Sequence, residues 1–504
     1  MQRFIYILSK HISHKNSNLI VLYLGGNMEH IKGMDRKQVL LFPEVIDDYI
    51  KEENPVKFMD AFVDSLDLIE LGFKHAELSP TGRPPYDPAD LLKLYIYGYL
   101  NRVRSSRFLE RECEKNVEVM WLLKKLTPDF KTIADFRKDN RDAIKKVFKE
   151  FTYLCKKLDL FGGELVAIDG SKFKAVNSKK RNFNEAKLKK RLKDIDEKIE
   201  SYLKEIDEND NNEAYVSPPD KEKLKGKIEL LKVRKEEYQE LLKKLKESGE
   251  TQVSLTDPDS RAMLNNQKIE VCYNVQMSVD EKNKLILDYE VTNEVVDSNQ
   301  LSEMSKRAKD ILDVKELKVT ADAGYYNPEE IKECLDNGIT PYVPERNPDG
   351  KKNADPSFSK RKFTYDKEKD VYVCPAGNEL KFWATYDARS EKLYKTEKCS
   401  SCEFRPRCTS HKRGRIVTRR KYEDILQENR KRIKENMGMV NKRKELVEHP
   451  FGTIKRSFNQ GYMLMKRLYK VGTEISLTVL AYDITRVINI VGVEKLMTEI
   501  AVYS

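Results

Sequence analysis

The sequence predicts a mixed α/β fold, in which a helix-flanked sheet is joined to a helical part and a cysteine-rich part. Segment 165–175, LVAIDGSKFKA, begins as a short apolar strand, and residues 252–344 alternate strand-like and helical patterns. Residues 35–160 carry apolar side chains mainly at helical spacing. Residues 345–423 are rich in Lys, Arg, Pro and Asn and hold four clustered cysteines. This order of patterns predicts a mixed sheet with additions rather than a single repeated unit.

The composition favours a large protein that has a polyanionic partner. The chain has 504 residues, 35% charged residues, 39% hydrophobic residues and a net charge of +11. That length is sufficient for several domains, and the grouping of basic residues matters more than their sum. No apolar run is long enough for a membrane span, so no membrane partner is expected. Four cysteines are isolated and are expected to be reduced, which excludes a secreted disulfide scaffold: Cys113, Cys155, Cys272 and Cys334.

The first 160 residues divide into a leader and a helical domain. Residues 1–34 are a leader of uncertain status, with two apolar patches but no signal-peptide pattern, and Met28 or Met34 could be the start. Residues 35–160 contain short basic helices with tight connections, which suit a DNA-binding unit of the helix-turn-helix type. An ordinary helical bundle with solvated Arg and Lys explains the same pattern.

Residues 183–249 are predicted to form a coiled-coil helical hairpin inserted in the sheet-forming part. Two heptad runs flank a polar loop at residues 207–220, and the loop contains Asn and Pro. The ends of such a hairpin return close together, so it can interrupt another domain. The first run consists of Leu188, Leu192, Ile195, Ile199, Tyr202 and Ile206.

Two acidic residues follow predicted apolar strands. The strand at 165–168 ends on Asp169, and Gly170 is expected to permit a sharp change of direction. A second strand, in LKVTADAGYYN, ends on Asp322 and is also followed by glycine. Each residue alone could cap a turn. If the strands are neighbours, however, the two carboxylates repel unless a cation lies between them, which predicts a Mg²⁺ site.

A third acid and several basic residues complete this candidate site. Glu448 lies in a helical pattern and is the best candidate for a third metal ligand, since two-metal phosphoryl-transfer sites need one. Its basic neighbours suit phosphates: Arg443, Lys444, Lys455 and Arg456. Lys172 could reach a phosphate or be a surface lysine, and Lys174 lies beside it. Asp297, between a strand and a helix, is first explained as a helix cap.

Four cysteines have the spacing of a small zinc site: Cys374-x24-Cys399-x2-Cys402-x5-Cys408. His411 could replace Cys408, and four reduced thiols without metal are the alternative. A basic, proline-rich loop buries little apolar surface and would need such a crosslink. The following segment, RPRCTSHKRGRIVTRRK, has no acid and is predicted to contact a DNA backbone.

The ordered motifs resemble those of bacterial insertion-sequence transposases of the DDE type. The resemblance covers most of residues 35–490 and rests on GRPPYDP, AIDGSKFKA, TDPDSRAM, YNVQ, EVTNEVVDSNQL, ADAGYYN, CPAGNEL with KCSSCEFRPRC, and VEHPFGTIKR with AYDITR. It implies an RNase H-like catalytic domain built from residues 161–344 and 424–504. The hairpin at 183–249 and the cysteine-rich basic insertion at 345–423 would interrupt this domain.

The resemblance also implies a reaction. Asp169, Asp322 and Glu448 would be the catalytic acids and would bind Mg²⁺ or Mn²⁺. The protein would bind terminal inverted repeats, cleave double-stranded DNA and transfer the strand to a target, in a bacterial cytoplasm and on the nucleoid when DNA-bound. Paired transposon ends imply a homodimer. A decayed or repurposed DNA-binding protein and a nuclease that only hydrolyses are the alternatives.

The family's glutamate helix departs from its usual pattern here. The family places a Tyr, an Arg and a Lys around the Glu, and these positions are Asn441, Lys444 and Lys455 in this sequence. The Tyr is absent, and the Arg is replaced by Lys444 unless Arg443 substitutes for it. The residues expected to contact DNA are Lys172, Lys174, Arg443, Lys444, Lys455 and Arg456.

Overall fold

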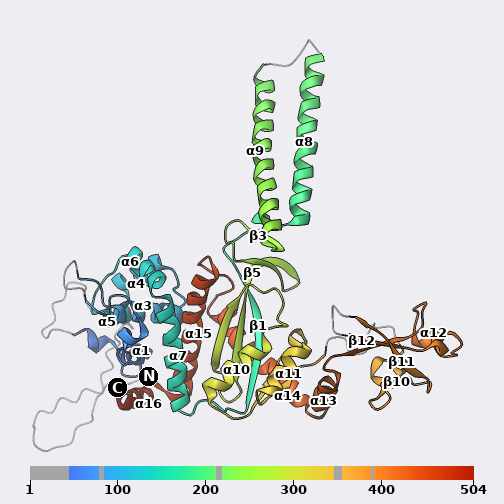
Figure 1. The fold of residues 1–504 in the computed structure, drawn as a ribbon. Helices are drawn as coiled ribbons and strands as arrows, with labels where there is room; N and C mark the ends of the chain where they lie inside the picture. The colour runs from blue at the N-terminus through green and yellow to red at the C-terminus, as the bar shows by residue number, and fades with distance from the viewer. Residues whose placement is uncertain (1–44, 79–83, 212–217, 346–354, 387–390, 504) are drawn as a thin grey trace, which may run out of the picture.

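The computed structural model describes residues 45–78, 84–211, 218–345, 355–386 and 391–503. The leader predicted at residues 1–34 lies outside them. Figure 1 shows a helical region on one side of a central sheet, a long helical hairpin that projects from one end of that sheet, and a small second sheet on the far side. The chain is therefore mixed α/β, as the sequence predicts.

The central sheet has six strands, and Asp169 lies on one of its interior strands. Its order is β4-β5-β1-β7-β8, and β6 also pairs with β5. Strand β1 runs parallel to β7, which runs parallel to β8, whereas β5 is antiparallel to β1, β4 and β6. The bounds are β1 Leu165–Lys174, β4 Arg261–Asn265, β5 Lys268–Asp280, β6 Ile286–Thr292, β7 Leu317–Thr320 and β8 Ile339–Tyr342.

Strand β1 corrects one expectation. It continues through Gly170 to Lys174 in unbroken register with β5, so the chain does not change direction after Asp169. Gly170 is also not among the residues with a positive φ. The glycine is required for another reason, which is its close packing against side chains from β5.

Helices cover both faces of this sheet. Helices α10 (Leu301–Leu312) and α11 (Pro328–Asp336) lie on one side (Figure 1). Near the C-terminal end of the chain, α13 (Glu423–Glu435) leads into α14 (Met437–Gly452). Helix α14 packs on β1 through a mainly apolar stripe and passes into the π-helical segment η8 (Thr453–Ser457). Phe451 of α14 meets Phe173 of β1 with ring centroids 6.5 Å apart.

The N-terminal helices share one hydrophobic core with the central sheet. Helix α15 joins the two parts, because it packs against α7, α3 and β6 (Figure 1). Among the described residues no single helix is long and apolar enough to cross a membrane, although α15 and α16, bent by 103°, pass that test together. The bounds are η1 Ile46–Tyr49, α1 Pro55–Asp64, α2 Leu68–Leu71, α3 Pro88–Leu100, α4 Ser106–Lys115, α5 Val117–Leu122, α6 Phe130–Asp139, α7 Arg141–Lys157, α15 Leu468–Val491 and α16 Val493–Tyr503.

The hairpin consists of α8 (Glu185–Asn211) and α9 (Pro218–Ser248), which run beside each other away from the sheet (Figure 1). Short strands β2 (Asn182–Asn184) and β3 (Gln252–Ser254) pair at its base and bring its two ends together. Leu188 and Ile195 of the predicted heptad seam are buried, as are Leu224, Ile228 and Leu245 of the second run.

The cysteine-rich segment folds as a five-stranded antiparallel sheet in the order β13-β12-β11-β10-β9. The sequence predicted a cysteine-rich basic insertion with a possible zinc site here, but not its strands. The core of this sheet is small: Phe363, Tyr372, Leu380, Tyr394 and Val417. The bounds are β9 Thr364–Asp366, β10 Val371–Val373, β11 Glu379–Tyr386, β12 Glu391–Lys395 and β13 Ile416–Arg420. Short helical turns complete it: η4 Pro356–Phe358, η5 Lys360–Lys362, η7 Glu397–Ser400 and α12 Arg405–Cys408.

Candidate active site

Asp169 lies on β1, and Asp322 lies beside it, two residues after the end of the parallel strand β7. The register of β1 and β7 pairs Val166 with Val319 and Ala167 with Thr320. Extending it by two residues pairs Asp169 with Asp322, which caps the turn η3 (Ala323–Tyr325) directly after β7. The backbone N–H of Gly170 donates to Asp169 Oδ1 at 2.8 Å, and that of Gly324 donates to Asp322 Oδ1 at 2.6 Å. One carboxylate oxygen of each acid is thus held by a backbone donor.

The pKa of Asp169 reflects its burial and the acid beside it. Burial raises the pKa of Asp169 to about 6, and the neighbouring charge of Asp322 adds to this shift. Arg443 opposes it, because its Nη1 donates to Asp169 Oδ2 at 2.8 Å. The positive charge of Arg443 therefore offsets the repulsion between the carboxylates of Asp169 and Asp322. Arg443, not Lys444, is the residue of α14 that faces the acids.

Glu448 lies on α14 with an exposed side chain, five residues after Arg443. Five residues correspond to about 140° around an α-helix, so the two side chains leave α14 in different directions. Within the described ranges, no group of three His, Cys, Asp or Glu side chains is arranged to hold a metal ion. The structure thus brings two of the three predicted acids together, and the role of Glu448 stays a prediction.

Four of the six basic residues expected to contact DNA are engaged within the chain. Lys455 Nζ donates to Ser171 Oγ at 2.6 Å and lies over the Phe173 ring, and burial lowers its pKa to about 8. Lys174 Nζ lies 2.7 Å from Glu270 Oε1. Lys172 pairs with Asp297, and Arg443 with Asp169. The side chains of Lys444 and Arg456 are exposed.

Two stretches of the chain match families of known proteins. Residues 44–139 match a family described as Transposase domain (DUF772), and residues 373–488 match one described as Transposase DDE domain. The first match covers most of the N-terminal helices, and the second covers the Glu448 helix and most of α15. The chain belongs among the insertion-sequence transposases of the DDE type. The two matched segments follow each other along the chain in the same order as the motifs that carry the resemblance.

Other comparisons add little to this assignment. The transposase matches none of the curated proteins. Among solved structures it is similar to a cryo-EM structure of the piggyBac transposase synaptic complex with hairpin DNA. The identity is 10%, the match covers 90% of this chain and 79% of that chain, and the TM-score is 0.29. A TM-score this low supports no inference about the details of the fold.

Sequence reasoning missed a polar cluster directly behind Asp169. The sequence predicts a helix-capping role for Asp297, but the residue that caps α10 is Gln300. The Asp297 carboxylate instead accepts hydrogen bonds from Asn274 Nδ2 at 2.6 Å, Gln276 Nε2 at 2.8 Å and Lys172 Nζ at 3.1 Å. Three of these four residues lie in the motifs YNVQ and EVVDSNQL. Both motifs belong to the family resemblance, and this was the one sign in the sequence that the residues act together.

The four clustered cysteines of the transposase line one cavity of about 20 Å³. Burial raises the pKa of the Cys408 thiol, and proximity to Cys399, Cys374 and Cys402 raises it further. Gly414 packs against this cluster, because a Cβ there would lie 2.7 Å from Cys399 Cβ. The four sulfur atoms therefore gather in one place, although in this arrangement they are not set as metal ligands.

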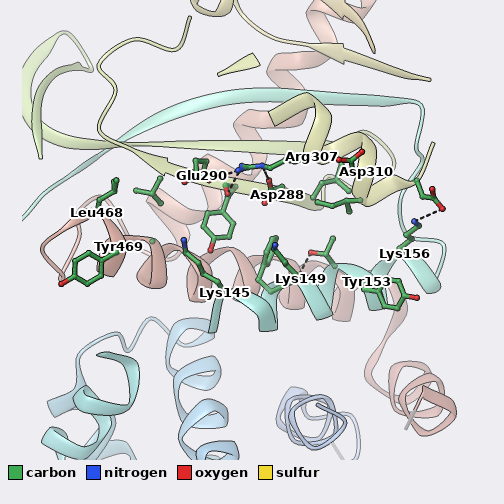
Figure 2. Close-up of a pocket in the computed structure, with 18 residues that line it drawn as sticks. Lys145, Lys149, Tyr153, Lys156, Asp288, Glu290, Arg307, Asp310, Leu468 and Tyr469 are labelled. Atoms are coloured by element: carbon green, nitrogen blue, oxygen red, sulfur yellow. Dashed lines mark hydrogen bonds and ion pairs between the residues drawn. The ribbon is translucent and has the colours of Figure 1, made fainter. Parts of the chain in front are cut away.

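A cavity of about 950 Å³ lies away from the acid pair, between α7 and the outer edge of β6 (Figure 2). Lys145 and Lys149 of α7 line one side, and Asp288 and Glu290 of β6 line the other. Arg307 pairs with Asp288 (Nε to Oδ2, 2.6 Å) and with Glu290 (Nη1 to Oε2, 2.9 Å). Strand β5 separates β6 from β1, so this cavity contains none of the predicted catalytic or DNA-contacting residues.

Proposed function

We propose that this transposase cleaves DNA at the ends of its element and joins the freed ends to target DNA in a metal-dependent reaction. The observation that carries the proposal is the acid pair: Asp169 lies on β1, and Asp322 lies beside it, just after the parallel strand β7. In this proposal the central sheet is an RNase H-like catalytic domain. A hydrolytic nuclease needs the same acids, so the joined product distinguishes the two activities.

The acid pair has the chemistry of a divalent cation site. Two carboxylates that are close together and partly shielded from water favour a hard cation, such as Mg²⁺ or Mn²⁺. The guanidinium of Arg443 supplies the compensating positive charge in this arrangement. Asp322 would hold the ion through the carboxylate oxygen that Gly324 does not restrain, and Asp169 would do so through Oδ2 after Arg443 has left that oxygen. Glu448, on the helix that carries Arg443, is the proposed third ligand.

The roles of the protein groups follow from their positions. A bound divalent ion would lower the pKa of the attacking water or 3′ hydroxyl and stabilise charge on the phosphate. Asp169 and Asp322 would hold the cation beside the end of β7, and Arg443 is positioned to turn from Asp169 to a phosphate oxygen. Lys444 and Arg456, which are exposed, are proposed to contact the DNA backbone. Lys172, Lys174 and Lys455 could do so only by leaving their present partners.

DNA recognition and assembly complete the proposal. The N-terminal helices, which match a transposase domain family, are proposed to bind the terminal inverted repeats. The joining of two ends in one reaction requires two active sites, so a homodimer is proposed.

The direct experiment uses the purified chain and duplexes from the flanks of its own gene. Incubation with Mg²⁺ or Mn²⁺ should give nicked or cut ends and, with a target plasmid, joined products. EDTA should abolish both. Binding of the same duplexes without any cation-dependent cleavage would contradict the proposal and favour a repurposed DNA-binding protein. Cleavage without joined products would favour a nuclease.

We also propose that the cysteine-rich sheet holds one structural Zn²⁺ between Cys374, Cys399, Cys402 and Cys408. All four thiols line the same cavity, and thiolates are the preferred ligands of structural zinc. The five buried apolar side chains of this sheet form a core too small to stabilise it well. A metal crosslink between the loop after β10 and the segment before β13 would offset that deficit.

Metal analysis of the purified transposase should therefore find about one zinc per chain. Replacing Cys402 with serine should remove most of this zinc and make residues 355–420 sensitive to protease, because one ligand of the crosslink is lost. Cys155→Ser is the matched control, since Cys155 is a buried thiol of α7 far along the chain from the cluster. Wild-type protein without zinc, or a Cys402→Ser variant that retains it, would contradict the site.

A further inference from the structure

Asp297 stands in the connection between β6 and α10 and gathers three side chains from two strands. Asn274 and Gln276 come from β5, and Lys172 comes from β1. Asn274 and Gln276 are fully buried, whereas Asp297 has 22% of its side chain exposed. A carboxylate that accepts three side-chain donors at this depth is held in one orientation.

The orientation of the Gln276 amide follows from Asp297. An ionised carboxylate can only accept hydrogen bonds, so it must face Gln276 Nε2. The other amide atom, Oε1, then points away and accepts a hydrogen bond from the Tyr325 hydroxyl. Tyr325 is buried and is the last residue of the turn that begins directly after Asp322. The charge of Asp297 is thus connected, through one amide, to the turn that carries Asp322.

This connection crosses β1 at Gly170. The register pairs Gly170 with Gln276, so both lie on the face of the sheet opposite to the Asp169 side chain. A Cβ at Gly170 would lie 2.3 Å from Gln276 Nε2, 2.9 Å from Asp297 Oδ1 and 3.0 Å from Asn274 Oδ1. Only glycine leaves room for the amide to reach from β5 to Tyr325. The cluster that contacts the turn after Asp322 therefore also requires glycine at position 170, next to Asp169.

We propose that Asp297 is a positioning residue of the transposase, which holds the Asp169 strand and the Asp322 turn in register through Gln276 and Tyr325. This inference rests on the proposed cleavage reaction. Asp297 itself pairs with Lys172 and the two amides and does not act on the DNA. Its effect is on the relative placement of the two acids, and small displacements of such groups slow a reaction by up to about 100-fold.

The test measures single-turnover cleavage of end DNA by Asp297→Asn. Asparagine has the same size but can also donate, so Gln276 is no longer forced into one orientation. The rate should fall about tenfold or more, while the affinity for end DNA and the melting temperature stay close to wild type. Tyr325→Phe, which removes one hydroxyl, should give a similar loss. The double variant should be no slower than the worse single variant, because both changes break one connection.

Two controls separate this inference from the function itself. Glu294→Gln neutralises an exposed acid in the same connection and should cleave normally. Gly170→Ala should reproduce the slow cleavage, whereas Gly438→Ala, where a Cβ meets open space, should not. Normal cleavage by Asp297→Asn and Tyr325→Phe, or losses that multiply in the double variant, would overturn the positioning role and leave the proposed reaction standing. A wild-type protein that does not cleave would instead reject the reaction.

Discussion

Replacing Asp169 with asparagine is expected to lower the rate of end-DNA cleavage by roughly a thousandfold, or ~4 kcal/mol in the activation free energy. The change keeps the size of the side chain but removes the charge that would hold a divalent cation beside Asp322. Asparagine keeps one oxygen, which can still accept from the Gly170 N–H, whereas its amide NH2 would face Arg443 in place of the second carboxylate oxygen. Only this one hydrogen bond is lost, so the fold should persist. Single-turnover cleavage in Mg²⁺ and in Mn²⁺ measures the effect.

Asp313→Asn provides the matched control for this change. Asp313 follows α10, and 90% of its side chain is exposed. This variant should cleave at the wild-type rate. If Asp169→Asn also cleaves at that rate, then the acid pair is not the catalytic centre. DNA binding should be similar in all three proteins, because Asp169 contributes no positive charge to it.

Removing Arg104 is expected to lower the stability of the transposase by ~3 kcal/mol. Arg104 follows α3, and its Nη1 donates to Glu474 Oε1 of α15 at 3.1 Å. Glu474 is fully buried, and burial raises its pKa although Arg137 and Arg104 oppose this. Arg104→Ala would leave the glutamate with two backbone donors, from Leu464 and Met465, and without its direct charge partner.

Thermal unfolding of Arg104→Ala should therefore begin at a clearly lower temperature than that of wild type. Lys138→Ala is the control, because the ion pairs of Lys138 on α6, with Asp135 at 3.6 Å and with Asp139 at 4.0 Å, are both exposed. Surface pairs of this kind contribute little to stability. An Arg104→Ala protein that melts like wild type would contradict the view that α15 is fixed to the N-terminal helices by this buried pair.

The sequence was a good guide to the two strands beside the acids, but not to where the first of them ends. An apolar run followed by Asp and Gly is a local pattern, and it indicated two strands that prove to be neighbours. Asp322 does follow the end of β7, whereas Asp169 lies within β1, which continues to Lys174. The same local view misjudged Gly170. Its role depends on Gln276 and Asp297, which are more than a hundred residues away, and no local pattern reveals a packing distance across a sheet.

Side-chain direction on α14 could not be predicted for the same reason. The helix was expected, but its rotation about its own axis is set by Phe451, Ile454 and the other apolar residues that pack on the sheet. That rotation turns Arg443 toward Asp169 and leaves Glu448 exposed. The cysteine-rich sheet was missed because its strands are only three to eight residues long and lack regular alternation.

The most direct test of the acid pair is the binding of Mn²⁺ to the DNA-free protein, measured by electron paramagnetic resonance. Wild type should bind the ion, and Asp169→Asn and Asp322→Asn should each lose most of that binding, whereas Asp313→Asn should retain it. A Glu448→Gln protein that binds more weakly would place the third acid in the same site. Equal Mn²⁺ binding by wild type, Asp169→Asn and Asp322→Asn would contradict a catalytic metal site at these strands.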